Sequence, residues 1–279
     1  MIVATGPTPP LLHRHRAIHA DTDASFKFFV DCIKGDPRLR GRVLDVGCGE
    51  RPSIITVGAL FPLYQLAASL DGLDPFPGVA SHPWMEHAWV GEVEKVQLPT
   101  EAYDAVLAIN VPEHIAEPVP FLRAISRTLK PGGVIYAITP HAHHPFAWSV
   151  RLIQAINLKR SMAAGNAEFN DYPAYYRLNS RSAVEHAGRA AGYATARVFY
   201  HPHTHWRTYL PRLMRPAGWL YDATLGVHVL SAGQQFMFML EKPGTGAGTV
   251  LPPRTSKVFH TAPVAPARAH VPAPSAPPS

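Results

Sequence analysis

The chain of 279 residues is long enough for one sizeable hydrophobic core, with or without a small subdomain. Lys and Arg outnumber Asp and Glu by 26 to 20, but the basic residues are scattered, so nucleic acid is not expected as a partner. The two cysteines lack Cys-x-x-Cys spacing, which argues against a disulfide framework and a thiolate zinc site and fits a reducing cytoplasm.

The first 20 residues show no periodic pattern of apolar side chains, and we expect them to form a flexible lead-in. From Thr22 the pattern changes, because apolar residues then recur at helical spacing behind a candidate N-cap. An amphipathic helix is therefore predicted before the first strand. Its periodic positions are Phe26, Phe29, Val30 and Ile33.

Seven short apolar runs predict β-strands, and the runs of the middle of the chain alternate with helix-like stretches. This alternation is typical of a parallel sheet with helices on both faces, so the expected fold class is α/β. The predicted strands are residues 42–46, 69–73, 88–90, 105–109, 134–139, 193–200 and 235–240.

Three further helices are predicted after the fourth predicted strand. Residues 120–129 are expected to form a helix that ends at the turn Lys130-Pro131-Gly132-Gly133. Residues 146–158 have an amphipathic pattern. Residues 180–192 form the third predicted helix, with Ser180 as its cap and Gly192 as its stop.

Residues 206–230 are inserted before the last predicted strand and are aromatic and basic together. Trp206 and Trp219, for example, lie near Arg207 and Arg215. This mixture is expected of a lid over an apolar substrate or of a helix on a membrane surface. A core-packing insertion is the third alternative, and the sequence leaves all three open.

Residues 243–279 are rich in Pro and Ala and have few apolar anchors, so we predict a disordered tail. The folded domain is then expected over residues 21–242. No segment reaches the roughly 20 apolar residues that span a bilayer, which favours a cytoplasmic protein.

The first chemical signal is a strand-like run that leads into two glycines, Gly47 and Gly49, where a ligand could approach the backbone closely. A dinucleotide-binding turn would continue to a third glycine, but that position holds Pro52. Asp45 and Glu50 flank the turn with negative charge, which repels phosphate. This setting suits a ligand with a cation and no phosphate, such as S-adenosylmethionine. The alternative is a mere strand-to-helix turn.

Five segments in order resemble motifs of the class I S-adenosylmethionine-dependent methyltransferases, and among subgroups they are most similar to the quinone-biosynthesis-like type 11 group. The resemblance covers residues 40–140 and implies a Rossmann-like, seven-stranded, mostly parallel sheet with a methyltransferase domain over residues 21–242. Arg51 departs from the small residue that the family often has. The segments are Asp45-Val46-Gly47-Cys48-Gly49, Leu73-Asp74-Pro75, Gly91-Glu92-Val93-Glu94, Tyr103-Asp104-Ala105-Val106 with the run from Asn110 to Ile115, and Leu129-Lys130-Pro131-Gly132-Gly133.

The resemblance implies S-adenosylmethionine as the cofactor and assigns residues to its parts. Asp74 would accept hydrogen bonds from both ribose hydroxyls, since one carboxylate presents two oxygens to a vicinal diol. Glu92 would accept from the exocyclic amine, Val93 would cover a face of the adenine, and Asn110 belongs to the motif beside the reactive methyl. Asp74 as a turn residue and Glu92 as a solvated acid are the alternatives. The other predicted cofactor-binding residues are Asp45, Gly47, Cys48 and Gly49.

Histidines follow the strands whose carboxyl ends form the cleft of an open α/β sheet, and His114, His141 and His144 are the candidates for a general base. Packing near the sulfonium is the alternative for His114. The runs 141–144 and 201–205 each hold three histidines and raise the hypothesis of a metal, because imidazole binds Zn, Ni and Cu. No bound metal is expected, since neither run has an associated carboxylate pattern.

The expected function is an S-adenosylmethionine-dependent methyltransferase that acts on a small-molecule or lipid-like acceptor, on oxygen. The protein would mainly align two reactants for an in-line displacement. No obligate protein partner is inferred, and peripheral membrane contact is left open. A non-catalytic scaffold with the methyltransferase fold is the first alternative, and a nucleotide-dependent oxidoreductase is the second.

Overall fold

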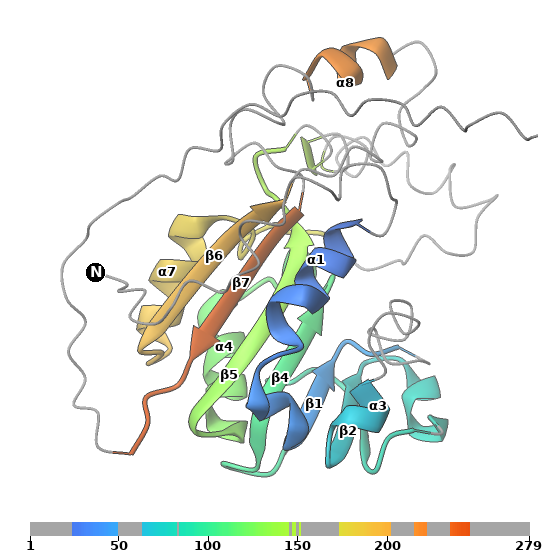
Figure 1. Cartoon of the computed structure of the whole chain (residues 1–279), viewed down its shortest axis with the longest axis vertical. Helices are drawn as coiled ribbons and strands as arrows, with labels where there is room; N and C mark the ends of the chain where they lie inside the picture. The colour runs from blue at the N-terminus through green and yellow to red at the C-terminus, as the bar shows by residue number, and fades with distance from the viewer. Residues whose placement is uncertain are drawn as a thin grey trace, which may run out of the picture.

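One sheet organises the part of the chain that the computed structural model describes (Figure 1). It contains β1 (Arg42–Val46), β2 (Ser69–Asp74), β3 (Ala88–Val90), β4 (Tyr103–Ile109), β5 (Leu129–Pro140), β6 (Thr195–His201) and β7 (Gln235–Glu241). Their order is β3-β2-β1-β4-β5-β7-β6. All pairs among β1 to β5 are parallel, and β7 runs antiparallel to both of its neighbours. The predicted seven-stranded, mostly parallel α/β sheet is therefore confirmed.

Helices cover both faces of this sheet (Figure 1). α4 (Pro118–Thr128) and α7 (Arg181–Ala190) bury Phe121, Leu122 and Val184 in a core against one face. α1 (Ala24–Ile33) buries Phe29, Val30 and Ile33 in a second core against the other. Two cores arise because successive side chains of a strand point to opposite faces. On β5, Ile135 and Ala137 belong to the first core, while Val134, Tyr136 and Ile138 belong to the second.

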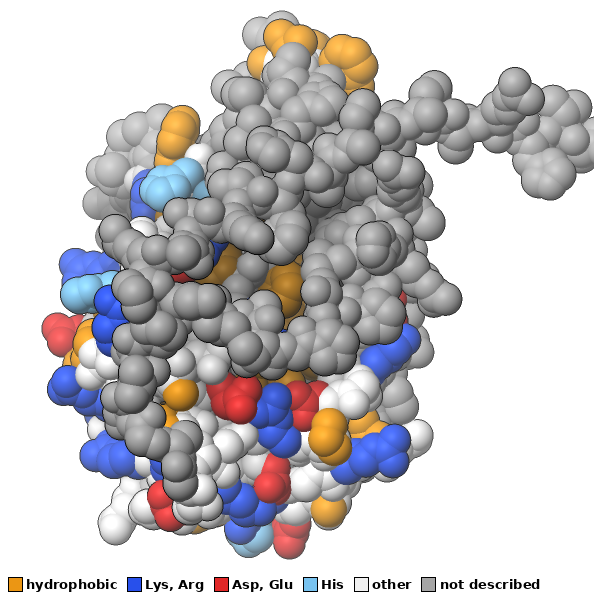
Figure 2. All heavy atoms as spheres, turned by 60° about the vertical axis from the view of Figure 1, so that its left-hand side comes forward, with side chains coloured by type: hydrophobic (Ala, Val, Ile, Leu, Met, Phe, Trp, Pro, Cys, Tyr) orange, Lys and Arg blue, Asp and Glu red, His pale blue; other side chains and the backbone are white. Residues whose placement is uncertain are grey.

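The remaining described helices are short. They are η2 (Pro37–Arg40), α3 (Leu63–Leu66), η3 (Pro77–Ser81), η4 (Pro112–His114) and α8 (Arg215–Tyr221). α8 lies beyond the upper end of the sheet in Figure 1 and exposes the large apolar side chains of Trp219 and Leu220. Figure 2 shows hydrophobic side chains at the top of the molecule, and charged side chains of both signs are interspersed below them. Among the described side chains visible on this face, no continuous basic stripe is seen.

The predicted turn at residues 130–133 is wrong, because these residues belong to β5. Tyr103 of β4 pairs with Leu129 of β5, and Ala105 pairs with Val134, so β5 has extra residues between the two pairs. Among them, Gly132 has a φ of 77°. The amide of Lys242 donates to the carbonyl of Gly133, and the amide of Gly132 donates to the carbonyl of Pro243. These hydrogen bonds to the chain after β7 hold the turn-like sequence in β5, where it forms an extended bulge.

The structure describes residues 24–49, 63–82, 84–144, 147–148, 151, 173–201, 215–221 and 235–245. The predicted lead-in, most of the predicted helix at 146–158, most of the insertion at 206–230 and nearly all of the predicted tail lie outside these ranges. Their predictions stand untested. Within the described ranges, every helix is too short or too polar to cross a bilayer.

Candidate active site

The glycine turn after β1 has the backbone that the motif predicts. Gly47 and Gly49 take φ values of 73° and 63°, in the left-handed region that glycine enters without steric cost. A Cβ on Gly47 would lie 2.2 Å from Cγ2 of Val111, so the turn also approaches the chain after β4 closely. Asp45, two residues earlier, is fully buried, and Cys48 is buried as well. The positive φ values therefore explain the glycines at positions 47 and 49, and the close contact with Val111 leaves no room for a side chain at position 47.

Asp74 ends β2 and connects this turn to the next part of the site. One carboxylate oxygen, Oδ2, accepts the backbone N–H of Gly49 at 2.8 Å, and Oδ1 accepts the N–H of Phe76 at 2.7 Å. Each carboxylate oxygen has a second lone pair with which it can accept from another donor. The side chain is only 8% exposed. Asp74 thus holds the glycine turn in place and can still receive hydroxyl groups.

The segment predicted to contact adenine lies beside Asp74, because the amide of Gly91 donates to the carbonyl of Asp74 at 2.9 Å. Val93 is buried in the first core. Glu92 is exposed, and its carboxylate accepts from Nζ of Lys95 at 2.8 Å. Val93 therefore has the apolar setting expected of it, whereas Glu92 forms a solvent-exposed ion pair.

Asn110 follows β4 and has a positive φ of 54°, which is uncommon for a residue with a side chain. Its amide donates to the carbonyl of Ile138 on β5 at 2.8 Å. The next residue, Val111, is the one that packs over Gly47. Asn110 thus lies near the glycine turn, where the order of the strands reverses between β1 and β4. Ligands of open α/β sheets bind at such a switch point.

These residues fit S-adenosylmethionine. The described part of the site brings together a glycine turn, the buried carboxylates of Asp45 and Asp74, and the apolar side chain of Val93. Carboxylates are suited to a ligand that carries an ammonium, a sulfonium and a vicinal diol and has no phosphate. Glu50, Arg51 and Pro52 lie outside the described residues.

His114 ends η4, just after β4, and is half-buried. Its Nδ1 lies 3.1 Å from the carbonyl oxygen of Pro173. A carbonyl oxygen only accepts, so Nδ1 carries the proton in this hydrogen bond. In the neutral ring the other nitrogen, Nε2, is then in its proton-accepting form. This is the tautomer that a general base requires.

His141 and His144 follow β5 and are both buried. The His141 ring is 2% exposed, stacks on Phe236 at 5.8 Å and meets the edge of Tyr200 at 5.1 Å. Burial, with a smaller contribution from His143, lowers the pKa of His141 from 6.5 to about 4. The backbone of this segment turns sharply, because the amide of His144 donates to the carbonyl of His141. His141 is therefore a neutral imidazole at physiological pH.

The lowered pKa of His141 predicts how stability depends on pH. Below pH 6.5 the unfolded chain binds a proton at His141, whereas the folded chain binds it only near pH 4. The contribution of His141 is thus fully present above pH 6.5 and is lost as the pH falls. Between pH 7 and pH 5 the loss should be about 2 kcal/mol.

Replacing His141 by Phe should remove this part of the pH dependence while keeping an aromatic ring beside Phe236 and Tyr200. The measurement is urea unfolding at pH 7 and pH 5, and the difference between the two should shrink by about 2 kcal/mol. His186→Gln, which removes an exposed histidine on α7, is the control. An unchanged difference in His141→Phe would contradict the prediction.

A buried polar network at the ends of β4 and β5 was not found from the sequence. Glu113 of η4, Thr139 of β5 and Asn179 are all buried. The Thr139 hydroxyl donates to Oε2 of Glu113 at 2.5 Å, and Nδ2 of Asn179 donates to Oγ1 of Thr139 at 2.6 Å. The sequence signal was the acid directly before His114, but nothing in it pointed to Thr139 or Asn179.

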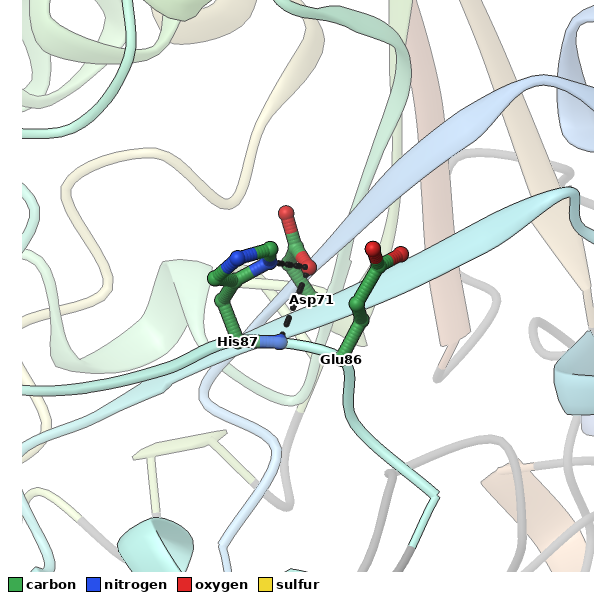
Figure 3. Close-up of side chains that lie close together, drawn as sticks. All are labelled: Asp71, Glu86 and His87. Atoms are coloured by element: carbon green, nitrogen blue, oxygen red, sulfur yellow. Dashed lines mark hydrogen bonds and ion pairs between the residues drawn. The ribbon is translucent and has the colours of Figure 1, made fainter.

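Among the described residues, one group of metal-ligand side chains lies close together: Asp71, Glu86 and His87 (Figure 3). Its central carboxylate is already occupied, because Oδ2 of Asp71 accepts from Arg42 at 2.7 and 2.9 Å and from the Tyr103 hydroxyl at 2.9 Å. Oδ1 accepts the backbone N–H of His87 at 3.1 Å. A cation here would face the Arg42 guanidinium, so this cluster is a structural ion pair. His203 and His205 of the second histidine run lie outside the described residues.

The fold and the site are those of an enzyme with an open α/β sheet that binds a nucleoside cofactor, and comparison with known proteins gives the family. Residues 18–222 match the model of a family described as a methyltransferase domain, and the chain belongs to this family. It is a class I S-adenosylmethionine-dependent methyltransferase, with S-adenosylmethionine as its cofactor. The resemblance predicted from the motifs is confirmed.

Similar proteins include ubiquinone biosynthesis O-methyltransferases. That of Xanthomonas oryzae is 28% identical over 134 residues, which cover 47% of this chain and 56% of the relative. That of Azorhizobium caulinodans is 34% identical over 112 residues, which cover 36% and 41%. The matches thus span only about half of the curated relatives' length.

A solved methyltransferase of Thermotoga maritima, described as a possible histamine N-methyltransferase, has a TM-score of 0.53 at 16% identity over 83% of this chain and 94% of that chain. A phosphoethanolamine N-methyltransferase of Haemonchus contortus, solved with S-adenosylhomocysteine, has a TM-score of 0.50 at 13% identity over 78% and 53%. These two likenesses bear on the fold alone.

Proposed function

We propose that the protein transfers a methyl group from S-adenosylmethionine to an oxygen of a small-molecule or lipid-like acceptor. The observation that carries the proposal is His114, whose Nδ1 is held by the Pro173 carbonyl at 3.1 Å, at the carboxyl end of β4. Oxygen nucleophiles gain from a base that takes their proton, and the neutral His114 tautomer is suited to that. Similarity to ubiquinone biosynthesis O-methyltransferases supports the same acceptor class.

The residues of the glycine turn would hold the cofactor. When bound, S-adenosylmethionine supplies a methyl group that its sulfonium has already activated. Asp74 would accept the ribose hydroxyls, and Val93 and Glu92 would contact the adenine. Asn110 would border the methyl. Asp45, Gly47, Cys48 and Gly49 would bind the methionine end.

Among the three histidines proposed as catalytic, His114 is the one that we assign as the base. His141 and His144 are buried, and an imidazole whose pKa is about 4, like that of His141, is a weak proton acceptor. For these two we propose a place in the wall of the acceptor site. The chain's main contribution to rate would be alignment of acceptor and cofactor, which can lower a barrier by roughly 7–11 kcal/mol.

The acceptor is proposed to lie between the end of β5 and the insertion at residues 206–230. Trp219 and Leu220 on α8, with 62% and 57% of their surface exposed, support an apolar acceptor or a lipid surface nearby. The scattered basic residues of the sequence speak against a nucleic-acid backbone as the substrate. No obligate protein partner is inferred for the proposed reaction.

The test combines cofactor titration with a methyl-transfer screen of phenols, hydroxylated lipids, RNA and protein. We expect transfer to a hydroxyl of a small or lipid-like compound, and His114→Ala should lower kcat by about 100-fold while leaving the cofactor Kd unchanged. Glu117→Gln removes an exposed charge at the start of α4 and is the control. Transfer only to RNA or protein, or full activity of His114→Ala, would refute the proposal.

A further inference from the structure

The network of Glu113, Thr139 and Asn179 has a defined direction. Nδ2 of Asn179 donates both to Oγ1 of Thr139 at 2.6 Å and to the carbonyl of Pro140 at 2.8 Å. The Thr139 oxygen thus receives a proton from Asn179, and its own hydroxyl proton goes to Glu113. If the hydrogen-bonding direction of any one of these three side chains were reversed, two donors or two acceptors would face each other. Such a chain specifies a single arrangement of the three residues.

The network fixes the chain segment 173–180 against the ends of β4 and β5. The backbone carbonyl of Glu113 accepts the N–H groups of Tyr175 at 2.7 Å and Tyr176 at 3.0 Å. At the other end of the segment, the carbonyl of Asn179 accepts the N–H of Ala142 at 2.9 Å. Between them, Nη1 of Arg177 donates to the carbonyl of Ala116 at 2.9 Å.

The segment is held in a conformation that it would not take unaided. Tyr176 has a φ of 54°, in the left-handed region that residues with a side chain rarely adopt. Its ring is buried beneath the guanidinium of Arg151, 4.9 Å from the ring centre. Strained residues of this kind persist only where the surrounding contacts over-determine them, and they occur preferentially at functional sites.

The same segment reaches back to His114. Pro173, at its start, provides the carbonyl that holds Nδ1 of His114 at 3.1 Å. Glu113 is therefore connected to the end of the segment through Thr139 and Asn179. The adjacent His114 is connected to its start through Pro173. Burial raises the pKa of Glu113, and the hydrogen bond from the Thr139 hydroxyl opposes that rise.

Stability alone gives a weak reason for such a network. A buried carboxyl with a polar relay is costly in an apolar core, and apolar residues of the same size commonly stabilise a protein equally well. The network joins three separate stretches at the carboxyl edge of the sheet, where ligands of this fold bind. Its position therefore points to the acceptor side of the site.

We propose that Glu113 is a positioning residue, which acts through Thr139 and Asn179 to fix segment 173–180 as a wall of the acceptor site and to orient His114. This inference rests on the proposed methyl transfer. Tyr175 and Tyr176 form the wall beside the base. Loosening the wall should affect the acceptor and leave the cofactor, which binds at β1 and β2, untouched.

The test uses two substitutions of Thr139, each of which changes one branch of the side chain: Thr139→Val replaces the hydroxyl by a methyl, and Thr139→Ser removes the methyl. Thr139→Val keeps the shape and removes the hydroxyl, whereas Thr139→Ser keeps the hydroxyl. Thr139→Val should raise the acceptor KM at least tenfold and lower kcat at least threefold, with the cofactor Kd within twofold of the parent. Thr139→Ser should stay within threefold of the parent in all three constants. Equal impairment of both variants, or full activity of Thr139→Val, would overturn the inference.

A second measurement is independent of turnover. Hydrogen exchange of the Tyr175 and Tyr176 amides should speed up at least tenfold in Thr139→Val and stay near the parent rate in Thr139→Ser. Unchanged exchange in Thr139→Val would overturn the positioning role. If the parent methylates no acceptor, the proposed function fails, while this comparison still decides whether the network holds the segment.

Discussion

Replacing Asp71 by Leu is expected to lower the free energy of unfolding by about 2–4 kcal/mol. The carboxylate is fully buried and accepts from the guanidinium of Arg42 at 2.7 and 2.9 Å, from the Tyr103 hydroxyl at 2.9 Å and from His87 at 3.1 Å. Leucine would leave the buried Tyr103 hydroxyl without its acceptor. Part of the Arg42 side chain reaches solvent, so its guanidinium can be hydrated again in the variant. The loss of unfolding free energy is therefore smaller than for a fully buried ion pair.

Urea unfolding checks the value, and the melting temperature should fall by roughly 5–15 °C. Glu86→Gln removes a neighbouring acid that is exposed, and it should change stability by less than about 0.5 kcal/mol. The double variant Asp71→Leu with Arg42→Met should recover part of the loss, because no charge is then left unpaired. A loss below about 1 kcal/mol in Asp71→Leu would show that these donors find water instead.

The strands were predictable because each is a short, mostly apolar run, and all except β4 end at or directly before a glycine, a proline or an acid. β1 and β3 have the predicted bounds, and β2 is one residue longer. β5 was misjudged, because the sequence Lys130-Pro131-Gly132-Gly133 is typical of a turn and only its pairing with the chain after β7 keeps it in the sheet. That pairing joins residues about a hundred positions apart, which no local pattern encodes.

The backbone of the glycine turn was predictable for the same local reason, because Gly47 and Gly49 directly follow β1 and take the positive φ values that glycine allows. The relay of Glu113, Thr139 and Asn179 was not, because its members are 26 and 40 positions apart and Thr139 looks like any strand residue. The burial of His141 also depends on later strands, since β6 and β7 supply Tyr200 and Phe236.

Asp74→Ala is expected to weaken cofactor binding by about 10- to 100-fold, because hydrogen bonds to a charged acceptor contribute about 1.5–3 kcal/mol each. Two effects would combine. The ribose hydroxyls would lose their proposed acceptor, and the N–H groups of Gly49 and Phe76 would lose the carboxylate that they donate to at 2.8 and 2.7 Å. Isothermal titration with S-adenosylhomocysteine measures the sum, and Glu86→Gln is the control.

A double cycle with 2′-deoxy and 3′-deoxy analogues separates the two effects of Asp74→Ala. If Asp74 accepts from the ribose, the parent should bind each deoxy analogue at least fivefold more weakly than S-adenosylhomocysteine, whereas the variant should bind all three almost alike. If Asp74 only anchors the glycine turn, the parent and the variant should show the same ratio between hydroxylated and deoxy ligands. In that case the carboxylate acts through the N–H of Gly49, and the proposed ribose contact belongs to another residue.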